Sequence, residues 1–143
     1  LYHPGGNLGK RLLLKTEELM VKGNAVPKVR NDVSVRDAIL EITSKRLGAT
    51  SVVDSDGKLV GIVTDGDLRR MLQKTTDVIN TTAEMMMNKH PKTIRQDTLA
   101  AIALQEMEAH NITQLIVVDE LYHPVGIVHL HELVKAGLGN ENQ

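Results

Sequence analysis

The chain of 143 residues has a formal net charge of −1, with 41% hydrophobic and 24% charged residues, which argues against disorder and against a basic nucleic-acid-binding surface. It has no cysteine, which excludes disulfides and thiol catalysis, and its only aromatic residues are Tyr2 and Tyr122, too few for base stacking. No stretch is apolar enough to span a bilayer, so we expect a soluble cytoplasmic protein that binds neither nucleic acid nor membrane.

The N-terminal segment is predicted to be a connector. The chain starts at Leu1 rather than Met and shows no export signal, so we interpret it as a fragment of a longer protein. Pro4-Gly5-Gly6 is a turn signal, and a short helical turn with Thr16 as its cap is expected at residues 16–20.

The first unit begins after this connector. Ser34 followed by Asp37 is typical of a capped helix start, and the apolar spacing that follows is helical. The expected elements are an extended piece at 26–29, a helix at 34–46, a strand at 50–53, a turn at 54–57, a strand at 58–64 and a helix from residue 67 to about 73.

The second unit repeats the first. The decapeptide at 61–70, Gly-Ile-Val-Thr-Asp-Gly-Asp-Leu-Arg-Arg, recurs in frame at 126–135, an offset of 65 residues. The strand at 92–95, the helix capped by Thr98 and the strand at 114–119 follow the same order, and the lead-in at 84–86 is aligned with that at 18–20.

The repeat predicts an α+β fold in which a β-α-β-β-α unit occurs twice. We divide the chain into a connector at 1–15, a first unit at 16–76, a second unit at 77–137 and a polar tail at 138–143. Each unit alone is too small to bury much apolar surface, so their sheets are expected to pack with pseudo-two-fold symmetry and to leave clefts between the halves.

The end of the first unit has the residues of an anion site. Thr64-Asp65-Gly66-Asp67 places side-chain oxygens and free N–H groups where a helix begins, a position that favours a phosphate. In this hypothesis Thr64 donates to phosphate and Asp67 accepts from ribose hydroxyls. The alternative is that both residues only cap the helix.

Other polar residues have open interpretations. His129, His131 and Glu132 stand in the equivalent frame of the second unit, where they either contact an anion, remain solvated or bind a metal, with His123 as a further candidate ligand. Arg69 and Arg70 are assigned to ligand phosphate, to a partner chain or to solvated surface. The three methionines at 85–87 are expected to fill the core, with an adaptable contact surface as the alternative.

The duplicated pattern ending in Gly-x-x-Thr-x-x-Asp resembles the cystathionine-β-synthase (CBS) domain pair, which usually binds adenine nucleotides or related ligands. The leader at 3–13, His-Pro-Gly-Gly-Asn-Leu-Gly-Lys-Arg-Leu-Leu, together with 64–70, is similar to the C-terminal part of bacterial arabinose 5-phosphate isomerases. Those proteins carry a sugar isomerase (SIS) domain before a CBS pair and make arabinose 5-phosphate from ribulose 5-phosphate for the lipopolysaccharide sugar Kdo.

The resemblance implies a regulatory role. Residues 1–15 would end the isomerase domain, and His3 matches a histidine that the family places at its active site. This fragment alone is expected to be inactive, because two regulatory units leave no room for the isomerase pocket.

The expected ligand is a nucleotide or nucleotide-sugar such as CMP-Kdo, with no required cofactor or metal. The expected partners are the chain's own isomerase domain and further copies of itself. An assembly element without a ligand is the alternative. The candidate ligand-binding residues are Thr50, Thr64, Asp65, Asp67, Thr113, His129, His131 and Glu132.

Overall fold

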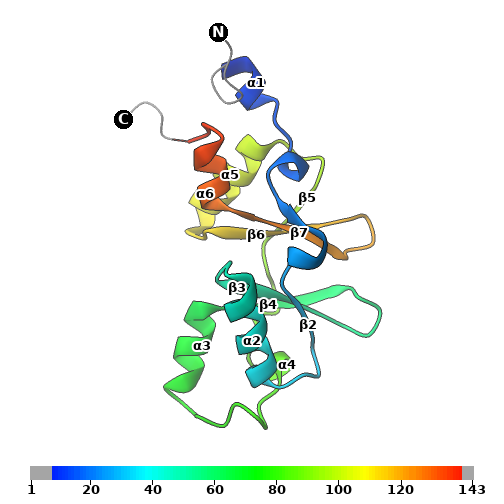
Figure 1. Ribbon diagram of the computed structural model, residues 1–143, viewed down its shortest axis with the longest axis vertical. Helices are drawn as coiled ribbons and strands as arrows, with labels where there is room; N and C mark the ends of the chain where they lie inside the picture. The colour runs from blue at the N-terminus through cyan, green and yellow to red at the C-terminus, as the bar shows by residue number, and fades with distance from the viewer. Residues whose placement is uncertain (1–7, 140–143) are drawn as a thin grey trace.

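The computed structural model of the chain describes residues 8–139 and contains two β-sheets (Figure 1). The first half supplies strands β2 (Lys28–Arg30), β3 (Ala49–Val53) and β4 (Leu59–Thr64) and helices α2 (Val35–Lys45) and α3 (Asp65–Leu72). Strand β3 lies between β2, to which it is parallel, and β4, to which it is antiparallel. Ser34 caps α2 as predicted, because its Oγ accepts the N–H of Asp37 at 3.3 Å.

The second half repeats this arrangement. Its elements are β5 (Thr93–Arg95), α5 (Ala100–His110), β6 (Gln114–Val118), β7 (Pro124–His129) and α6 (Leu130–Lys135), preceded by the short helix α4 (Ala83–Met86). The register of the strands is also repeated, with Lys28 opposite Ser51 and Thr93 opposite Ile116. The predicted duplication of a β-α-β-β-α unit is confirmed.

The lead-ins of the two halves are exchanged. The chain before the first unit forms α1 (Leu8–Leu12), the 3-10 turns η1 (Thr16–Glu18) and η2 (Gly23–Ala25), and between them strand β1 (Val21–Lys22). Strand β1 pairs with β7 of the second half, so that sheet has the order β1-β7-β6-β5. Reciprocally, Asn88 from the second lead-in exchanges two backbone hydrogen bonds, at 2.9 and 3.0 Å, with Ile62 of β4.

This exchange corrects the alignment of the lead-ins. Met20 lies against Gly126, and Met87 lies against Gly61. Equivalent lead-in residues are therefore 67 positions apart, so Met20 corresponds to Met87 and not to Met86. The predicted alignment of 84–86 with 18–20 is wrong by one residue, because it rests on similar residue types. The register of each lead-in is instead determined by the contact of its methionine with a glycine on the facing strand.

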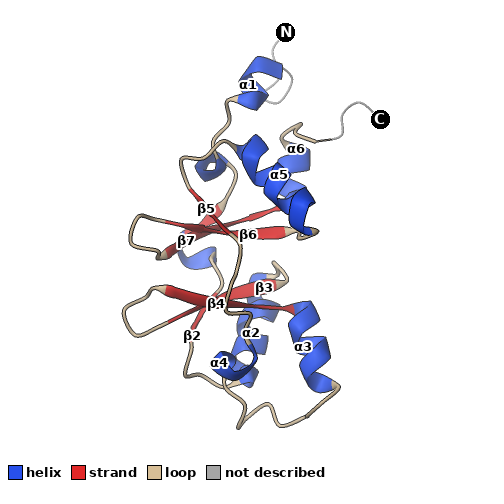
Figure 2. Cartoon of the chain, turned by 180° about the vertical axis from the view of Figure 1, so that it is seen from behind, coloured by secondary structure: helices blue, strands red, loops and turns tan. Residues whose placement is uncertain are grey.

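The two sheets pack against each other, and the helices cover their outer faces. Figure 2 shows α2, α3 and α4 beyond the first sheet and α5 and α6 beyond the second. The cluster between the sheets combines both halves and contains Ala49, Leu59, Ile62, Ile116, Val118 and Ile127. Burying one apolar face of each sheet in this way stabilises two units that are small alone. No helix within residues 8–139 has the length and apolar run needed to cross a bilayer.

Three predicted caps or starts differ in the structure. Helix α3 begins at Asp65 instead of Asp67, since Thr64 is its N-cap. Thr98 does not cap α5, whose N-cap is Leu99, and Thr16 does not cap η1, whose N-cap is Lys15. For Thr16 the reason is a tertiary contact: this buried residue donates through both its N–H and its hydroxyl to the carbonyl oxygen of Thr98, at 2.8 and 2.9 Å.

Candidate functional site

The start of α3 carries Thr64 and Asp67, two of the eight residues for which the sequence predicts ligand contact. Thr64 Oγ1 accepts the N–H of Asp67 at 3.1 Å, and Asp67 Oδ2 accepts the N–H of Thr64 at 2.9 Å. This reciprocal pair is a capping box, which satisfies two donors that a helix start leaves free. The structure therefore shows both residues capping the helix. A ligand would have to use the lone pairs of Asp67 and the hydroxyl hydrogen of Thr64 that these two bonds leave free.

Asp67 also faces a cavity of about 430 Å³ between α3 and α4. This volume is in the range of small-molecule sites. Five of its lining residues lie at positions 67–75 of the first unit and three at positions 81–86, in the lead-in of the second unit. The lining residues are Asp67, Arg70, Met71, Lys74, Thr75, Thr81, Met85 and Met86.

The cavity has one charged wall and one apolar wall. Arg70 Nη2 donates to Asp67 Oδ1 at 2.7 Å, with the Arg70 side chain 68% exposed and that of Asp67 19% exposed. Lys74, two residues after the end of α3, is exposed and has no ion-pair partner in residues 8–139. Two cations against one carboxylate leave an excess positive charge that favours an anionic ligand.

Among the charged residues that line this cavity, the sequence predicts ligand contact for Asp67 and, as one of three alternatives, for Arg70. Lys74 is not among the candidates predicted from the sequence; it follows Arg70 by four residues, just past the end of α3, and lines the same cavity. Met85 and Met86 line the cavity from α4. The expectation that Met85 fills the core is wrong, since its side chain is 69% exposed.

The remaining candidates of the first half lie apart from this cavity. Asp65 is exposed, and its N–H donates to the carbonyl of Gly48 at 3.0 Å. Thr50 is fully buried in β3, where its hydroxyl donates to Ser51 O at 3.1 Å. Because Thr50 is buried and lies outside the cavity lining, its contact with a ligand remains a prediction.

In the second half, His129 is the N-cap of α6. Its Nδ1 accepts the N–H of His131 at 3.1 Å, and the two rings meet edge to face with centroids 5.0 Å apart. Burial, and secondarily the neighbouring His131, lowers the pKa of His129. An acceptor at Nδ1 requires the neutral ring, so the capping role of His129 competes with the anion contact that was predicted.

Glu132 and Thr113 have interactions of their own. Glu132 lies 3.5 Å from Lys135 in an ion pair, and the carbonyl of the exposed Thr113 accepts the N–H of Leu130 at 2.8 Å. Within residues 8–139 no three His, Cys, Asp or Glu side chains are grouped as metal ligands. His123 pairs with Asp119 at 3.2 Å, at the opposite end of β7 from His129. The structure therefore does not bring His123 together with His129 as ligands of one metal ion. His3 lies outside the described residues.

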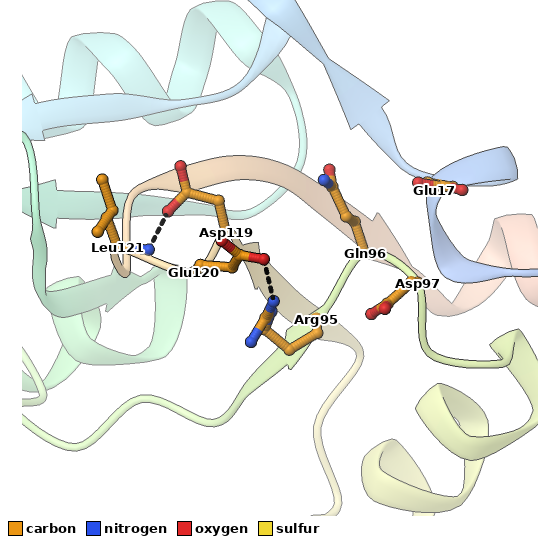
Figure 3. Close-up of a pocket in the computed structure, with 7 residues that line it drawn as sticks. All are labelled: Glu17, Arg95, Gln96, Asp97, Asp119, Glu120 and Leu121. Atoms are coloured by element: carbon orange, nitrogen blue, oxygen red, sulfur yellow. Dashed lines mark hydrogen bonds and ion pairs between the residues drawn. The ribbon is translucent and has the colours of Figure 1, made fainter.

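A second cavity, which the sequence does not predict, lies beside the turn between β6 and β7 (Figure 3). It has about 420 Å³ and is lined by Glu17, Arg95, Gln96, Asp97, Asp119, Glu120 and Leu121. The backbone N–H of His123 donates to Asp119 at 2.8 Å and lowers the pKa of that carboxyl. Arg95 is the one cation of the lining and lies 3.8 Å from Glu120.

The two halves differ at the position of this cavity. In the first half, Asn31 Nδ2 donates to Glu84 Oε1 at 2.7 Å, which ties the lead-in to the end of β2. The equivalent residues of the second half are Gln96 and Glu17, and no side-chain hydrogen bond joins them in the part of the chain that the structure describes. Four carboxylates beside one guanidinium make this cavity unsuited to a phosphate.

The sequence model of the CBS domain family matches residues 17–74 and 83–139. Arabinose 5-phosphate isomerase KdsD of Pseudomonas aeruginosa is 48% identical to the chain over 136 residues, which cover 95% of this chain and 42% of that protein. The match is to the C-terminal region of the relative. The chain therefore spans less than half the length of the curated relatives that it matches.

Solved structures show the same architecture. The CBS domain pair of protein MJ0100, in complex with 5'-methylthioadenosine and S-adenosyl-L-methionine, superposes with a TM-score of 0.77 at 24% identity and covers 86% of this chain and 94% of its own. The CBS domain protein PAE2072 from Pyrobaculum aerophilum, complexed with AMP, has a TM-score of 0.75 at 21% identity over 83% and 89%. At this identity the likeness establishes the fold.

Proposed function

The chain belongs to the CBS domain family, and from that premise we propose that it is the regulatory, ligand-binding CBS pair of an arabinose 5-phosphate isomerase. The whole protein would interconvert ribulose 5-phosphate and arabinose 5-phosphate in the cytoplasm for Kdo and lipopolysaccharide synthesis. The pair alone would be catalytically inactive. It would bind a nucleotide or nucleotide-sugar and pass its occupancy to the isomerase domain as a coupling free energy between two sites.

The observation that carries this proposal is the cavity that joins Asp67 to Arg70 and Lys74. The volume of about 430 Å³ fits a nucleotide, and the excess cation suits its phosphate. Asp67 offers carboxylate lone pairs to ribose hydroxyls, while the methionines of the other wall offer an adaptable apolar surface to a base. The adenosine derivatives bound by MJ0100 and the AMP bound by PAE2072 support a nucleoside or nucleotide ligand.

Feedback control suggests one ligand in particular. CMP-Kdo is the activated sugar that the Kdo pathway delivers, and it combines a nucleotide with a sugar acid. A ligand of this class in the cavity would report the product level to the isomerase. Thr64, Asp65, Thr50, Thr113, His129, His131 and Glu132 remain predicted contacts for such a ligand or for one at the second half.

The N-terminal end supports contact with a preceding domain. Figure 1 shows α1 extending away from the two sheets. Leu8, Leu12 and Leu13 are exposed there and belong to none of the hydrophobic clusters of the CBS pair. Leucines in this position suit an apolar surface on the isomerase domain, which residues 1–15 would connect to the first unit.

The test is thermal unfolding of the 143-residue chain with CMP-Kdo, CMP, AMP, ATP and arabinose 5-phosphate. A ligand that binds only the folded state adds about 2.7 kcal/mol of stability at a hundredfold excess over its Kd. Lys74→Gln should weaken binding by roughly tenfold or more, since charge-assisted contacts contribute about 1.5–3 kcal/mol. Lys135→Gln, at the end of α6 and outside the cavity, removes the same charge as a control and should leave binding unchanged.

Assembly is the second candidate function. Each of the four longer helices exposes one large aliphatic side chain: Leu40, Leu72, Ile102 and Val134. In this function these side chains would contact further copies of the chain. If no ligand of the panel raises the unfolding midpoint and sedimentation shows a dimer that Leu72→Gln with Val134→Gln dissociates, the assembly function replaces the ligand-binding one.

A further inference from the structure

The six methionines of the chain differ sharply in exposure. Met71 and Met107 are buried, Met20, Met86 and Met87 are partly buried, and Met85 is 69% exposed. Oxidation of a thioether to a sulfoxide requires access to the sulfur, so Met85 is the methionine that a soluble oxidant reaches first.

The sulfur of Met85 is held in a defined position. In the capping box of α4, the N–H of Thr82 points to Met85 Sδ at 3.4 Å, while Thr82 Oγ1 accepts the N–H of Met85 at 3.3 Å. A glutamate or glutamine oxygen usually stands where this sulfur stands. A thioether is only a weak acceptor, so the helix start gains little from the contact.

Met85 is also part of the cavity wall that faces the charged residues of α3. Together with Met71 and Met86 it forms the apolar side of the site, and no aromatic residue lines the cavity. A sulfoxide on Met85 would add a strongly polar S=O group to this wall. Its oxygen is an acceptor that competes with a ligand phosphate for the donors of Arg70 and Lys74.

We propose that Met85 is an oxidation site through which a peroxide weakens anionic-ligand binding in the α3–α4 cavity. This inference rests on the proposed function, because it names a regulation of the same site. The sulfur lone pair attacks one oxygen of hydrogen peroxide, the S–O bond forms as the O–O bond breaks, and the proton on the sulfur-bound oxygen passes to the leaving hydroxide to give the sulfoxide and water. The sulfur is oxidised by two electrons, and the peroxide is reduced by two.

The experiment treats the 143-residue chain with limiting hydrogen peroxide and locates the added oxygen by peptide mass spectrometry. AMP and CMP-Kdo binding is then measured by calorimetry before and after treatment. We expect Met85 to be oxidised before the other five methionines and affinity to fall by up to about tenfold. Met85→Leu should show the same affinity after treatment as the same variant shows before treatment.

Met86→Leu is the matched control, since it removes a less exposed methionine from the same wall and should still lose affinity on treatment. Oxidation of another methionine ahead of Met85, or unchanged affinity of protein oxidised at Met85, overturns the inference and leaves the proposed function intact. Failure of the untreated protein to bind either probe overturns the proposed function, and with it this regulation, whatever the order of oxidation.

Discussion

Met87 lies directly on Gly61, so that a Cβ atom at position 61 would stand 2.5 Å from Met87 Sδ and 2.9 Å from the carbonyl oxygen of Asn88. The glycine is therefore required by the close approach of the second lead-in to β4, and not by a turn. Gly126 has the same relationship to Met20. Each half holds the lead-in of the other through a glycine on a buried strand, which joins the two units into one cooperative structure.

Gly61→Ala should destabilise the chain by about 1–3 kcal/mol, because the added methyl overlaps both a side chain and a backbone oxygen. Urea unfolding measures the loss. Met87→Ala in the same chain should recover only part of it, since the backbone oxygen of Asn88 cannot move away without breaking its bonds to Ile62. Gly66→Ala is the control: its Cβ meets nothing closer than 3.4 Å and α3 gains helix propensity, so equal destabilisation of both variants would contradict the packing argument.

Gln114→Ala should cost about 0.5–1.5 kcal/mol of unfolding free energy. Gln114 Nε2 donates to Leu47 O at 2.9 Å, the side-chain bond by which the start of β6 holds the loop before β3. Denaturant unfolding reports the change. Gln105→Ala, on the exposed side of α5, should be neutral; a neutral result at Gln114 would mean that water replaces the bond between the halves at no cost.

Thr64→Ala should destabilise the chain by about 1 kcal/mol through loss of the α3 cap. Thr64→Asn keeps a capping oxygen but removes the hydroxyl, so it should restore stability. Nucleotide affinity separates the two roles of this residue. If Thr64 only caps, Thr64→Asn binds normally; if its hydroxyl also donates to phosphate, this variant is as stable as the parent and binds more weakly.

The stability of the chain should fall as the pH drops below the ordinary pKa of histidine, about 6.5. Burial lowers the pKa of His129 in the folded protein, so the unfolded chain binds a proton first and acid favours unfolding. The contribution is present above about pH 6.5 and is lost as the pH falls through the lowered pKa of the folded state.

Thermal unfolding between pH 7.5 and 5 tests this. His129→Asn supplies a capping oxygen that does not titrate, and it should flatten the slope that His129 contributes. His90→Asn, which removes an exposed histidine, should leave that slope in place. A slope that survives His129→Asn unchanged would assign the pH dependence to other groups.

The sequence alone determined the features that depend on neighbours along the chain. The duplicated β-α-β-β-α order, the 65-residue offset and the Ser34 cap follow from side-chain periods and from contacts three or four residues apart. The position of Asp67 at a helix start was predicted for the same reason, although the helix begins two residues earlier than expected.

Only the tertiary structure decided which segments meet. Thr16 and Thr98 are 82 residues apart, and the Thr16 hydroxyl predicted to cap a helical turn donates instead to the Thr98 carbonyl. The exchange of the lead-ins, the bond from Gln114 to Leu47 and the approach of α4 to α3 that forms the candidate site likewise join distant residues. Local propensity carries no information on such pairs, because their stabilisation appears only when two sheets and their lead-ins pack together and bury the contact.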